Sequence, residues 1–429
     1  MGRHLPYRPA RSLSTSAYRT PIGWPSHLFR TLDCSEDQMI EITQTANIRF
    51  SDVTNWMDQH ALPFWATTGY DADRQVCRES LALDGSINDP GFRRIRALAR
   101  QVYVYSHAEM LDWNGPAAAI AETTLDFMTR HGWQGPDKGW ASRLDDNGRV
   151  IDGTPDLYDQ AFALFALAWR FRATGETAYL DLADQTLDFI TDKMRAPDGL
   201  GYLEQVPPTS DERCQNPHMH LVEALIVLAH CRRSTRYLEL ATTIVDLYEF
   251  RIVDSDSGAL REIFGPGWNV LASEAGQITE PGHQFEWVWI LNEYEKAGGR
   301  KVDALTDKLF KFATSHGLAP ETGLTYDQVL DNGQVAKGSF RSWPQTETLK
   351  ALLAMGERTG KFELNRIAQV VDNVFQYYLA HKPIGTWIDQ LNSGREPTST
   401  YIPSTTLYHI YLAFAELRRL EPAIRSQTS

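Results

Sequence analysis

The sequence predicts an all-α protein, an (α/α)6 toroidal barrel with short β-hairpins in the connecting loops. The first observation behind this prediction is a series of prolines, each ahead of an apolar stretch with helical spacing. These prolines are Pro90, Pro155, Pro217, Pro281, Pro344 and Pro403. Their separations are 65, 62, 64, 63 and 59 residues. Proline is favoured in the first turn of a helix because its missing N–H would have no partner there. The series therefore marks six helix starts in one repeat.

The second observation is the content of each repeat. A further helical pattern follows the opened helix, as in residues 179–194 and 364–381. Loops with aromatic, glycine and acidic residues precede the starts, at residues 69–85, 139–148, 199–205, 258–265, 323–333 and 385–394. Short alternation within these loops predicts two-stranded hairpins. Six helix pairs that close into a ring hide the apolar ends that an open array would expose.

Composition narrows the classes of function. The chain has 429 residues, with 42 Lys and Arg against 55 Asp and Glu, a net charge of −13. This charge disfavours nucleic-acid and anionic-membrane partners, and the apolar runs are too short to span a bilayer. The four cysteines show no C-x-x-C spacing, which disfavours a zinc site or disulfide framework and favours the cytoplasm. The oligomeric state is left open, a homo-oligomer included.

The first 32 residues differ from the rest of the chain. They contain several arginines and no acid before Asp33. This composition resembles a transit peptide and fits equally a disordered head or an incorrectly assigned start. We expect a basic, disordered head over residues 1–32, a single barrel domain over residues 33–420 and a tail over residues 421–429.

Histidines recur near the predicted helix starts, where the ring would gather six helix N-termini and favour negative charge. His220, His283 and His409 fall at equivalent places in the repeat. His283 and Glu286 stand three residues apart and share a helix face, so the carboxylate would orient the imidazole or raise its basicity. His218 and His220 diverge around a helix and would not share an ion, so we expect no metal.

Carboxylates and aromatic side chains leave other chemistries open. Two acids across a glycosidic bond would make a glycosidase, and the candidates are Asp159, Glu223, Glu286 and Glu347. That scheme leaves the histidines unexplained. Aromatic residues near the helix starts would either pack in the core or offer flat faces to a small polar ligand such as a sugar. These are Trp65, Tyr103, Tyr158, Trp287, Trp343 and Trp387.

Six motifs together resemble the N-acylglucosamine 2-epimerase superfamily of sugar epimerases and isomerases. They are RQVYVYSHA (100–108), DLYDQAFALFALA (156–168), NPHMHLVEAL (216–225), EPGHQFEWVWIL (280–291), RSWPQTETLKALL (341–353) and TTLYHIYLAF (405–414). The resemblance covers roughly residues 50–420. It implies an (α/α)6 barrel, in agreement with the six predicted helix starts.

The resemblance also implies roles for individual residues. His283 and His409 would be the acid/base pair that moves protons at C1 and C2 of a monosaccharide. Arg100 would bind a substrate oxygen, with His220 and Glu286 nearby. Further substrate-binding positions would be Tyr158, Asp159, Trp343 and Gln345. The reaction would need no cofactor, because it involves no net oxidation.

The NPHMHL motif is more similar to the aldose–ketose isomerase branch, which acts on mannose or sulfoquinovose. The expected reaction therefore interconverts D-mannose and D-fructose through a cis-enediol or enediolate. A 2-epimerase of the N-acylglucosamine or cellobiose type is the alternative, followed by a glycoside hydrolase or a non-catalytic sugar-binding protein. Two loops depart from the family pattern, DADRQVCRES (71–80) and SEAGQITEPGH (273–283), and both would shape the sugar pocket.

Overall fold

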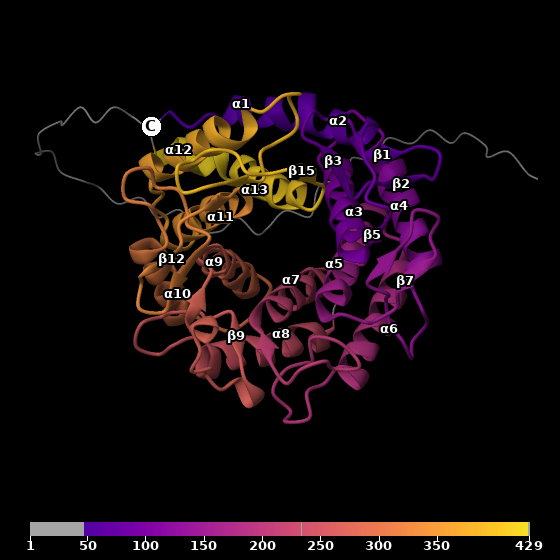
Figure 1. The fold of residues 1–429 in the computed structure, drawn as a ribbon, viewed down its shortest axis with the longest axis horizontal. Helices are drawn as coiled ribbons and strands as arrows, with labels where there is room; N and C mark the ends of the chain where they lie inside the picture. Colours follow the sequence, from indigo (N-terminus) through magenta and orange to yellow (C-terminus); the bar gives the residue numbers. More distant parts are fainter. Residues whose placement is uncertain (1–46, 233, 428–429) are drawn as a thin grey trace, which may run out of the picture. The chain divides into compact units, whose positions relative to one another are not determined.

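A ring of paired helices makes up residues 47–232 and 234–427, the part of the chain that this computed structural model describes (Figure 1). The inner helices are α3 (Ile95–Met110), α5 (Leu157–Thr174), α7 (Gln215–Cys231), α9 (Pro281–Lys296), α11 (Ser342–Thr359) and α13 (Thr406–Gln427). The outer helices include α4 (Ala117–Gly132), α6 (Thr177–Lys193), α8 (Thr235–Leu247), α10 (Asp303–His316) and α12 (Leu364–Asn373). The predicted (α/α)6 toroid is confirmed.

The two ends of the described chain close the ring. The sixth outer position is filled by α1 (Phe50–Asn55), a π-helical stretch (Trp56–Ala61) and α2 (Leu62–Thr67), and α1 packs on α13. The last inner helix thus takes its partner from the start of the barrel. Helix α13 continues through Pro422 to Gln427 and includes most of the segment expected as a tail. The predicted head (1–32) and the expected domain start at residue 33 lie outside the described residues.

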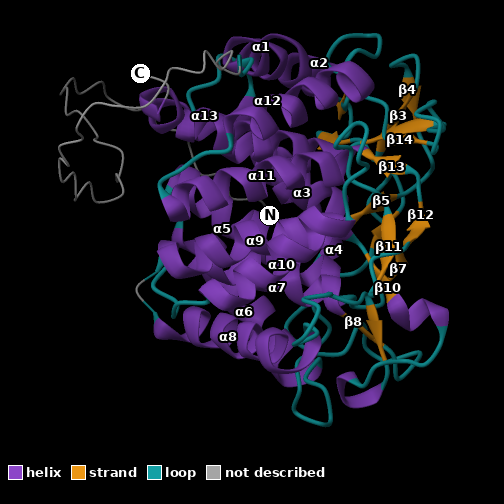
Figure 2. Ribbon diagram, turned by 90° about the vertical axis from the view of Figure 1, so that its left-hand side faces the viewer, coloured by secondary structure: helices purple, strands orange, loops and turns teal. Residues whose placement is uncertain are grey.

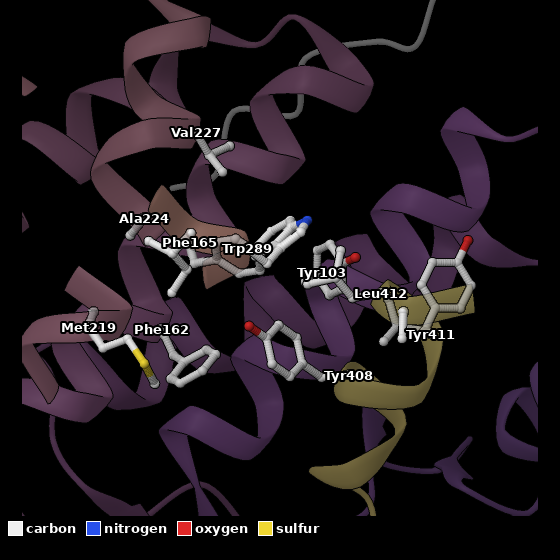
Figure 3. Packing of buried hydrophobic residues seen from close by; sticks show 14 of the residues in the cluster. Tyr103, Phe162, Phe165, Met219, Ala224, Val227, Trp289, Tyr408, Tyr411 and Leu412 are labelled. Carbon is white, nitrogen blue, oxygen red and sulfur yellow. The ribbon is translucent and has the colours of Figure 1, made fainter. Parts of the chain in front are cut away.

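Burial distinguishes the inner helices from the outer ones. Residues 221–228 of α7 are all at most 8% exposed, because an inner helix packs against its outer partner and against both inner neighbours. Aromatic side chains from α3, α5, α9 and α13 converge inside the ring (Figure 3). Tyr103 lies 4.9 Å from Phe165, and Tyr408 lies 5.5 Å from Phe162, measured between ring centroids. Within the described residues no helix is long and apolar enough to cross a membrane.

Short strands gather at one end of the barrel (Figure 2). They are β1 (Tyr70–Asp71), β2 (Val76–Cys77), β3 (Ser80–Ala82), β4 (Ile87–Asn88), β5 (Arg93–Arg94), β6 (Arg143–Leu144), β7 (Val150–Asp152), β8 (Arg213–Cys214), β9 (Ile263–Phe264), β10 (Ile278–Thr279), β11 (Gln328–Leu330), β12 (Val335–Lys337), β13 (Phe340–Arg341), β14 (Gln390–Leu391) and β15 (Tyr401–Pro403).

These strands link one repeat to the next. The antiparallel sheets are β5-β6-β7, β8-β9, β10-β11-β12, β13-β14 and β15-β3-β4, with β1-β2 as a separate hairpin. In each of the first four, the strand that leads into an inner helix pairs with a strand from the following loop. The β15-β3 pairing joins the last repeat to the first. Hairpins are present in three of the six predicted loops, at residues 69–85, 139–148 and 323–333. The prediction is wrong for the other three, because residues 199–205 form only isolated bridges and the strands at 258–265 and 385–394 pair with strands of other loops. The short strands hold the N-terminal ends of the inner helices together.

Candidate active site

One position of the repeat is polar in four consecutive inner helices and aromatic in the other two. The polar residues, each at most 6% exposed, are His220 (α7), Glu286 (α9), Glu347 (α11) and His409 (α13). Tyr103 of α3 and Phe162 of α5 stand at the corresponding positions. Five of the six lie within the first two turns of their helices, and Tyr103 lies in the middle of α3. The ring therefore has a buried polar side that faces an aromatic side.

His409 is held by a carboxylate from the neighbouring inner helix. Its Nδ1 lies 2.7 Å from Oε1 of Glu347. Burial, with the positive charges of Arg100 and Lys350, lowers the pKa of His409 well below its usual range. His409 is therefore a neutral imidazole at pH 7. With Nδ1–H donated to Glu347, Nε2 is the nitrogen left for a ligand.

His283 is held by two carboxylates and has the opposite charge state. Its Nδ1 lies 2.9 Å from Oε2 of Glu262 and 3.7 Å from Oε2 of Glu280. Burial alone would lower the pKa of His283, but the negative charges of Glu262, Glu280 and Glu286 outweigh burial and raise it to about 9. His283 is therefore an imidazolium at pH 7, with Nδ1–H bound to Glu262.

Glu262 is a functional residue that the sequence reasoning missed. We expected Glu286 to orient His283 or to raise its basicity. The charge of Glu286 does raise the pKa of His283, but the imidazole is oriented by its hydrogen bond to Glu262, in the loop between α8 and α9. The missed signal was the acid that recurs in the loops. Glu79, Glu204 and Asp327 each accept a hydrogen bond from the backbone N–H of the residue just before an inner helix. Glu262 does the same for Glu280 and uses its second oxygen for His283.

Trp343 brings the two histidines into one site. Its indole, at the start of α11, lies 4.9 Å from the His283 ring and 5.4 Å from the His409 ring, measured between centroids. The close approach to α9 requires glycine at position 282, where a Cβ would stand 2.7 Å from two indole carbons. The indole is partly exposed. Trp343 therefore offers a flat apolar face between two imidazoles.

His220 belongs to a second hydrogen-bonded chain across the ring. Its Nδ1 lies 3.0 Å from Oε2 of Glu223, and the Tyr408 hydroxyl donates to the other oxygen of Glu223 at 2.5 Å. Burial would raise the pKa of Glu223, but the His220 hydrogen bond and the charge of Lys350 lower it. Glu223 is thus a buried carboxylate that fixes both His220 and the residue beside His409.

Arg100 and Tyr158 form the edge of the site on α3 and α5. The Arg100 guanidinium donates to the Tyr158 hydroxyl at 2.7 Å and lies over the rings of Phe162 and Tyr408, at 4.2 and 5.1 Å from their centroids. It is 6% exposed, and Tyr158 is partly exposed. A guanidinium held against aromatic faces keeps its remaining N–H groups for a ligand oxygen.

Glu286 lies within the site without a hydrogen-bond partner among the described residues. Both of its carboxylate oxygens are buried, and the Lys350 ammonium is 4.0 Å from one of them. Two groups of three residues have the spacing of a metal site, because the potential ligand atoms in each group lie within 4.8 Å of one another. The groups are His220, Glu223 and Glu286, and Glu286, Glu347 and His409. The ammonium already supplies a positive charge beside these carboxylates. We assign no metal here, and its absence stays a prediction.

Asp159 and Gln345 contact the backbone. Asp159 accepts from the N–H of Arg96 at 2.9 Å, and burial raises its pKa to about 7. The amide of Gln345 accepts from the N–H of Thr325 and donates to its carbonyl, at 2.8 and 3.0 Å. Gln160 makes the same pair with Trp140. Asp159 and Gln345, both predicted from the sequence as substrate-binding positions, therefore hold the backbone around the site.

The remaining candidates from the sequence pack in the core. His218 accepts from the N–H of Tyr202 at 2.9 Å, and burial lowers its pKa to about 4. The Trp65 and Trp387 rings stack on each other at 5.0 Å. Tyr103 and Trp287 are fully buried, so of the six aromatic candidates only Tyr158 and Trp343 keep an exposed face.

Comparison with known proteins supports a common origin for this arrangement. The N-acylglucosamine 2-epimerase (GlcNAc 2-epimerase) family matches residues 78–413. A mannose-6-phosphate isomerase of Rhizobium meliloti (strain 1021) is 30% identical over 86% of this chain and 97% of its own length. A D-mannose isomerase of Thermobifida fusca is 24% identical over 64% of this chain and 72% of its own length.

A solved structure shows the same fold. The cellobiose 2-epimerase from Bacillus thermoamylovorans B4167 superposes with a TM-score of 0.79, at 20% identity, over 86% of this chain and 98% of its own. The family match begins just after the β1-β2 hairpin and ends within α13, so it covers five inner helices in full and the start of the sixth. The chain therefore belongs to the N-acylglucosamine 2-epimerase family.

Proposed function

We propose that the protein is a cofactor-independent aldose–ketose isomerase that interconverts D-mannose and D-fructose. The observation that carries the proposal is the pair of histidines against one indole, His283 protonated and His409 neutral. An acid and a base with separated pKa values, both within reach of one small ligand, form the arrangement that proton transfer between adjacent carbons requires.

The first half of the reaction uses the two histidines in different roles. His283 assists opening of the sugar ring and then gives a proton to O1 of the open-chain aldose. His409, through Nε2, removes the proton from C2. The product of these two transfers is a cis-enediol, or an enediolate before O1 is protonated. Oriented donors stabilise such an anion most strongly in a water-excluded site, and Arg100 with the helix N-termini supplies them.

The second half reverses the roles at the neighbouring atoms. His409 returns its proton to C1, while the O2 proton passes back to His283 and C2 becomes the ketone. One proton leaves carbon and one returns, so no oxidant or reductant is consumed. A return of the proton to the opposite face of C2 would give the 2-epimer. The isomerase and the alternative epimerase therefore use the same groups and differ in which carbon is reprotonated.

Relatives favour the isomerase outcome and leave the epimerase as the alternative. Two of them carry the names mannose-6-phosphate isomerase and D-mannose isomerase, and others carry the name cellobiose 2-epimerase or N-acylglucosamine 2-epimerase. Tyr158, Trp343, His220 and Glu286 would contact the sugar, whereas Asp159 and Gln345 would support the site through backbone. Cytoplasmic location stays a prediction of the sequence, and the oligomeric state stays open.

Incubation with mannose in D2O, followed by NMR of the products, tests the proposal. The expected result is fructose with deuterium at C1 and recovered mannose with deuterium at C2. Glucose as the main product would instead establish the epimerase. Parallel samples with mannose 6-phosphate, lyxose, sulfoquinovose, N-acetylmannosamine and cellobiose define the substrate. A new reducing end from a glycoside, or sugar binding without exchange at carbon, would contradict both forms of the proposal.

A further inference from the structure

Lys350 is a buried cation for which the mechanism above has no use. It lies one turn after Glu347 in α11, and its side chain is 0% exposed. Its ammonium is 2.7 Å from Oε2 of Glu347, 4.0 Å from Oε1 of Glu286 and 4.3 Å from the centroid of the Trp289 ring. A buried ammonium costs several kcal/mol unless it is paired. The presence of the Lys350 ammonium in the protein interior therefore calls for a reason beyond packing.

The groups around Lys350 show what the ammonium neutralises. The ionisable groups that interact with Lys350, with Glu347 or with His409 are Glu223 and His220 of α7, Glu286 and His283 of α9, Tyr408 of α13, and Arg100 of α3. Glu223, Glu286 and Glu347 are three acids within one buried volume. Carboxylates that lie so close together repel one another, which raises their pKa values and favours protonation. Lys350 is the cation in direct contact with Glu347.

We propose that Lys350 is a positioning residue that keeps Glu347 a carboxylate, so that His409 donates Nδ1–H to Glu347 and presents an unprotonated Nε2 to the substrate. The alternative proton position is specific. If Glu347 carried the proton, its O–H would donate to Nδ1, and the neutral imidazole would carry its hydrogen on Nε2, where it cannot act as a base. This inference rests on the proposed role of His409 as the base.

Lys350 opposes the other influences on Glu347 and acts with them on His409. Burial and the charge of Glu286 raise the pKa of Glu347 well above its usual range, and Lys350 is the largest influence that lowers it. The same ammonium adds to burial and to Arg100 in lowering the pKa of His409. One cation thus favours the carboxylate form of the acid and the neutral form of the base, which is the reactive combination.

The K350M variant tests the proposal, with K350R as the conservative variant and K311M, an exposed lysine of α10, as the matched control. We expect kcat of K350M to fall about 10²-fold near pH 7, the size of a lost general base. KM should stay within about threefold, because the sugar contacts are unchanged. The acidic limb of the pH profile should move up by about one unit or more, so that part of the loss is recovered at high pH. K350R should retain most activity, and K311M should match the wild type.

Two activity results would overturn the proposal. One is a folded K350M protein with wild-type kcat and an unchanged pH profile. The other is equal inactivity of folded K350M and K350R at every pH, which would indicate a steric role.

A measurement on the intact wild type covers the case in which K350M does not fold. The 15N NMR spectrum of histidine-labelled protein, with His409 assigned by comparison with H409Q, reports the tautomer at the pH of maximal activity. We expect a protonated Nδ1 and a bare Nε2, and the reverse tautomer would refute the inference. This spectrum does not depend on the identity of the sugar. Failure to isomerise any sugar would refute the proposed function while leaving the tautomer as an independent result.

Discussion

The two histidines of the site lie against the same indole and are each bound through Nδ1 to a glutamate, yet they differ in charge. The partner of His283 is Glu262 on a loop, with Glu280 close by, and the pKa rises to about 9. The partner of His409 is Glu347, which is itself paired with Lys350, and the pKa falls well below its usual range. A histidine–glutamate pair does not by itself fix the charge of the imidazole.

The difference comes from what surrounds each pair. Near His283 negative charges outnumber positive ones and outweigh the cost of burial. Near His409 the cations Arg100 and Lys350 act in the same direction as burial. The fold therefore produces an acid and a base from one residue type by giving His283 a glutamate partner from a loop and His409 a glutamate partner from an inner helix.

The largest expected effect is at the proposed base. Replacement of His409 by glutamine should lower kcat by about 10³- to 10⁴-fold, at the upper end of general-base contributions. It should also abolish deuterium incorporation at C2 of recovered mannose in D2O. The matched control is H218Q, since glutamine stands at that repeat position in α5, α9 and α11. Exchange at C2 that persists in H409Q would assign the base elsewhere.

The proposed acid should have the next largest effect. H283Q removes the imidazolium that opens the ring and protonates O1, and kcat should fall about 10²- to 10³-fold. The variant should keep its fold, as checked by circular dichroism, and some C2 exchange, since the base is intact. A loss as complete as that of H409Q, exchange included, would show that the two histidines are not divided into acid and base.

Removal of the charge at Glu262 tests why the pKa of His283 is high. His283 must be protonated to act, so kcat/KM of the wild type should fall above about pH 9. E262Q removes the negative charge that raises this pKa, so the alkaline limb should move down by about one to two units. The acidic limb, which belongs to His409, should stay in place.

The control for E262Q is E204Q. Glu204 accepts a backbone N–H in the equivalent loop and binds Cys214 rather than a histidine. The E204Q variant should leave both limbs of the pH profile unchanged. If E262Q leaves the alkaline limb in place, Glu262 is not the residue that raises the pKa of His283.

The smallest expected effect concerns the indole that the two histidines share. G282A places a Cβ 2.7 Å from the Trp343 ring, so the ring must shift. We expect kcat/KM to fall about tenfold, as misplacement of a positioning group costs catalysis without removing chemistry. G338A is the control, since its Cβ would meet ordinary contacts at 3.7 Å or more. Equal kinetics of G282A and the wild type would show that the indole position is unimportant.

Repetition made much of the fold predictable from sequence. The spacing of the prolines predicted six inner helices, although only Pro217, Pro281 and Pro344 lie inside the first turn. Pairing of β15 with β3 and of α1 with α13 was not predictable, because it depends on closure of the ring rather than on any local pattern.

The site was predictable where a residue type recurs and unpredictable where contacts cross the chain. Recurrence near the helix starts singled out His220, His283 and His409, although only His220 and His409 share one repeat position, which Glu286 occupies in α9. Glu262 acts on His283 over 21 residues and Glu347 on His409 over 62, and no local spacing signals either pair. Local spacing predicted that Glu286 would orient His283 or raise its basicity; its charge does raise the pKa of His283, but the hydrogen bond of the imidazole goes to Glu262.

The most direct test of the account is a pH titration of the two imidazoles by 15N NMR of histidine-labelled protein, with assignments from H283Q and H409Q. The account predicts that at pH 7.5 both nitrogens of His283 are protonated, that His283 loses a proton near pH 9, and that His409 stays neutral well below pH 6.5. Two histidines in the same protonation state at pH 7.5 would contradict the division into acid and base.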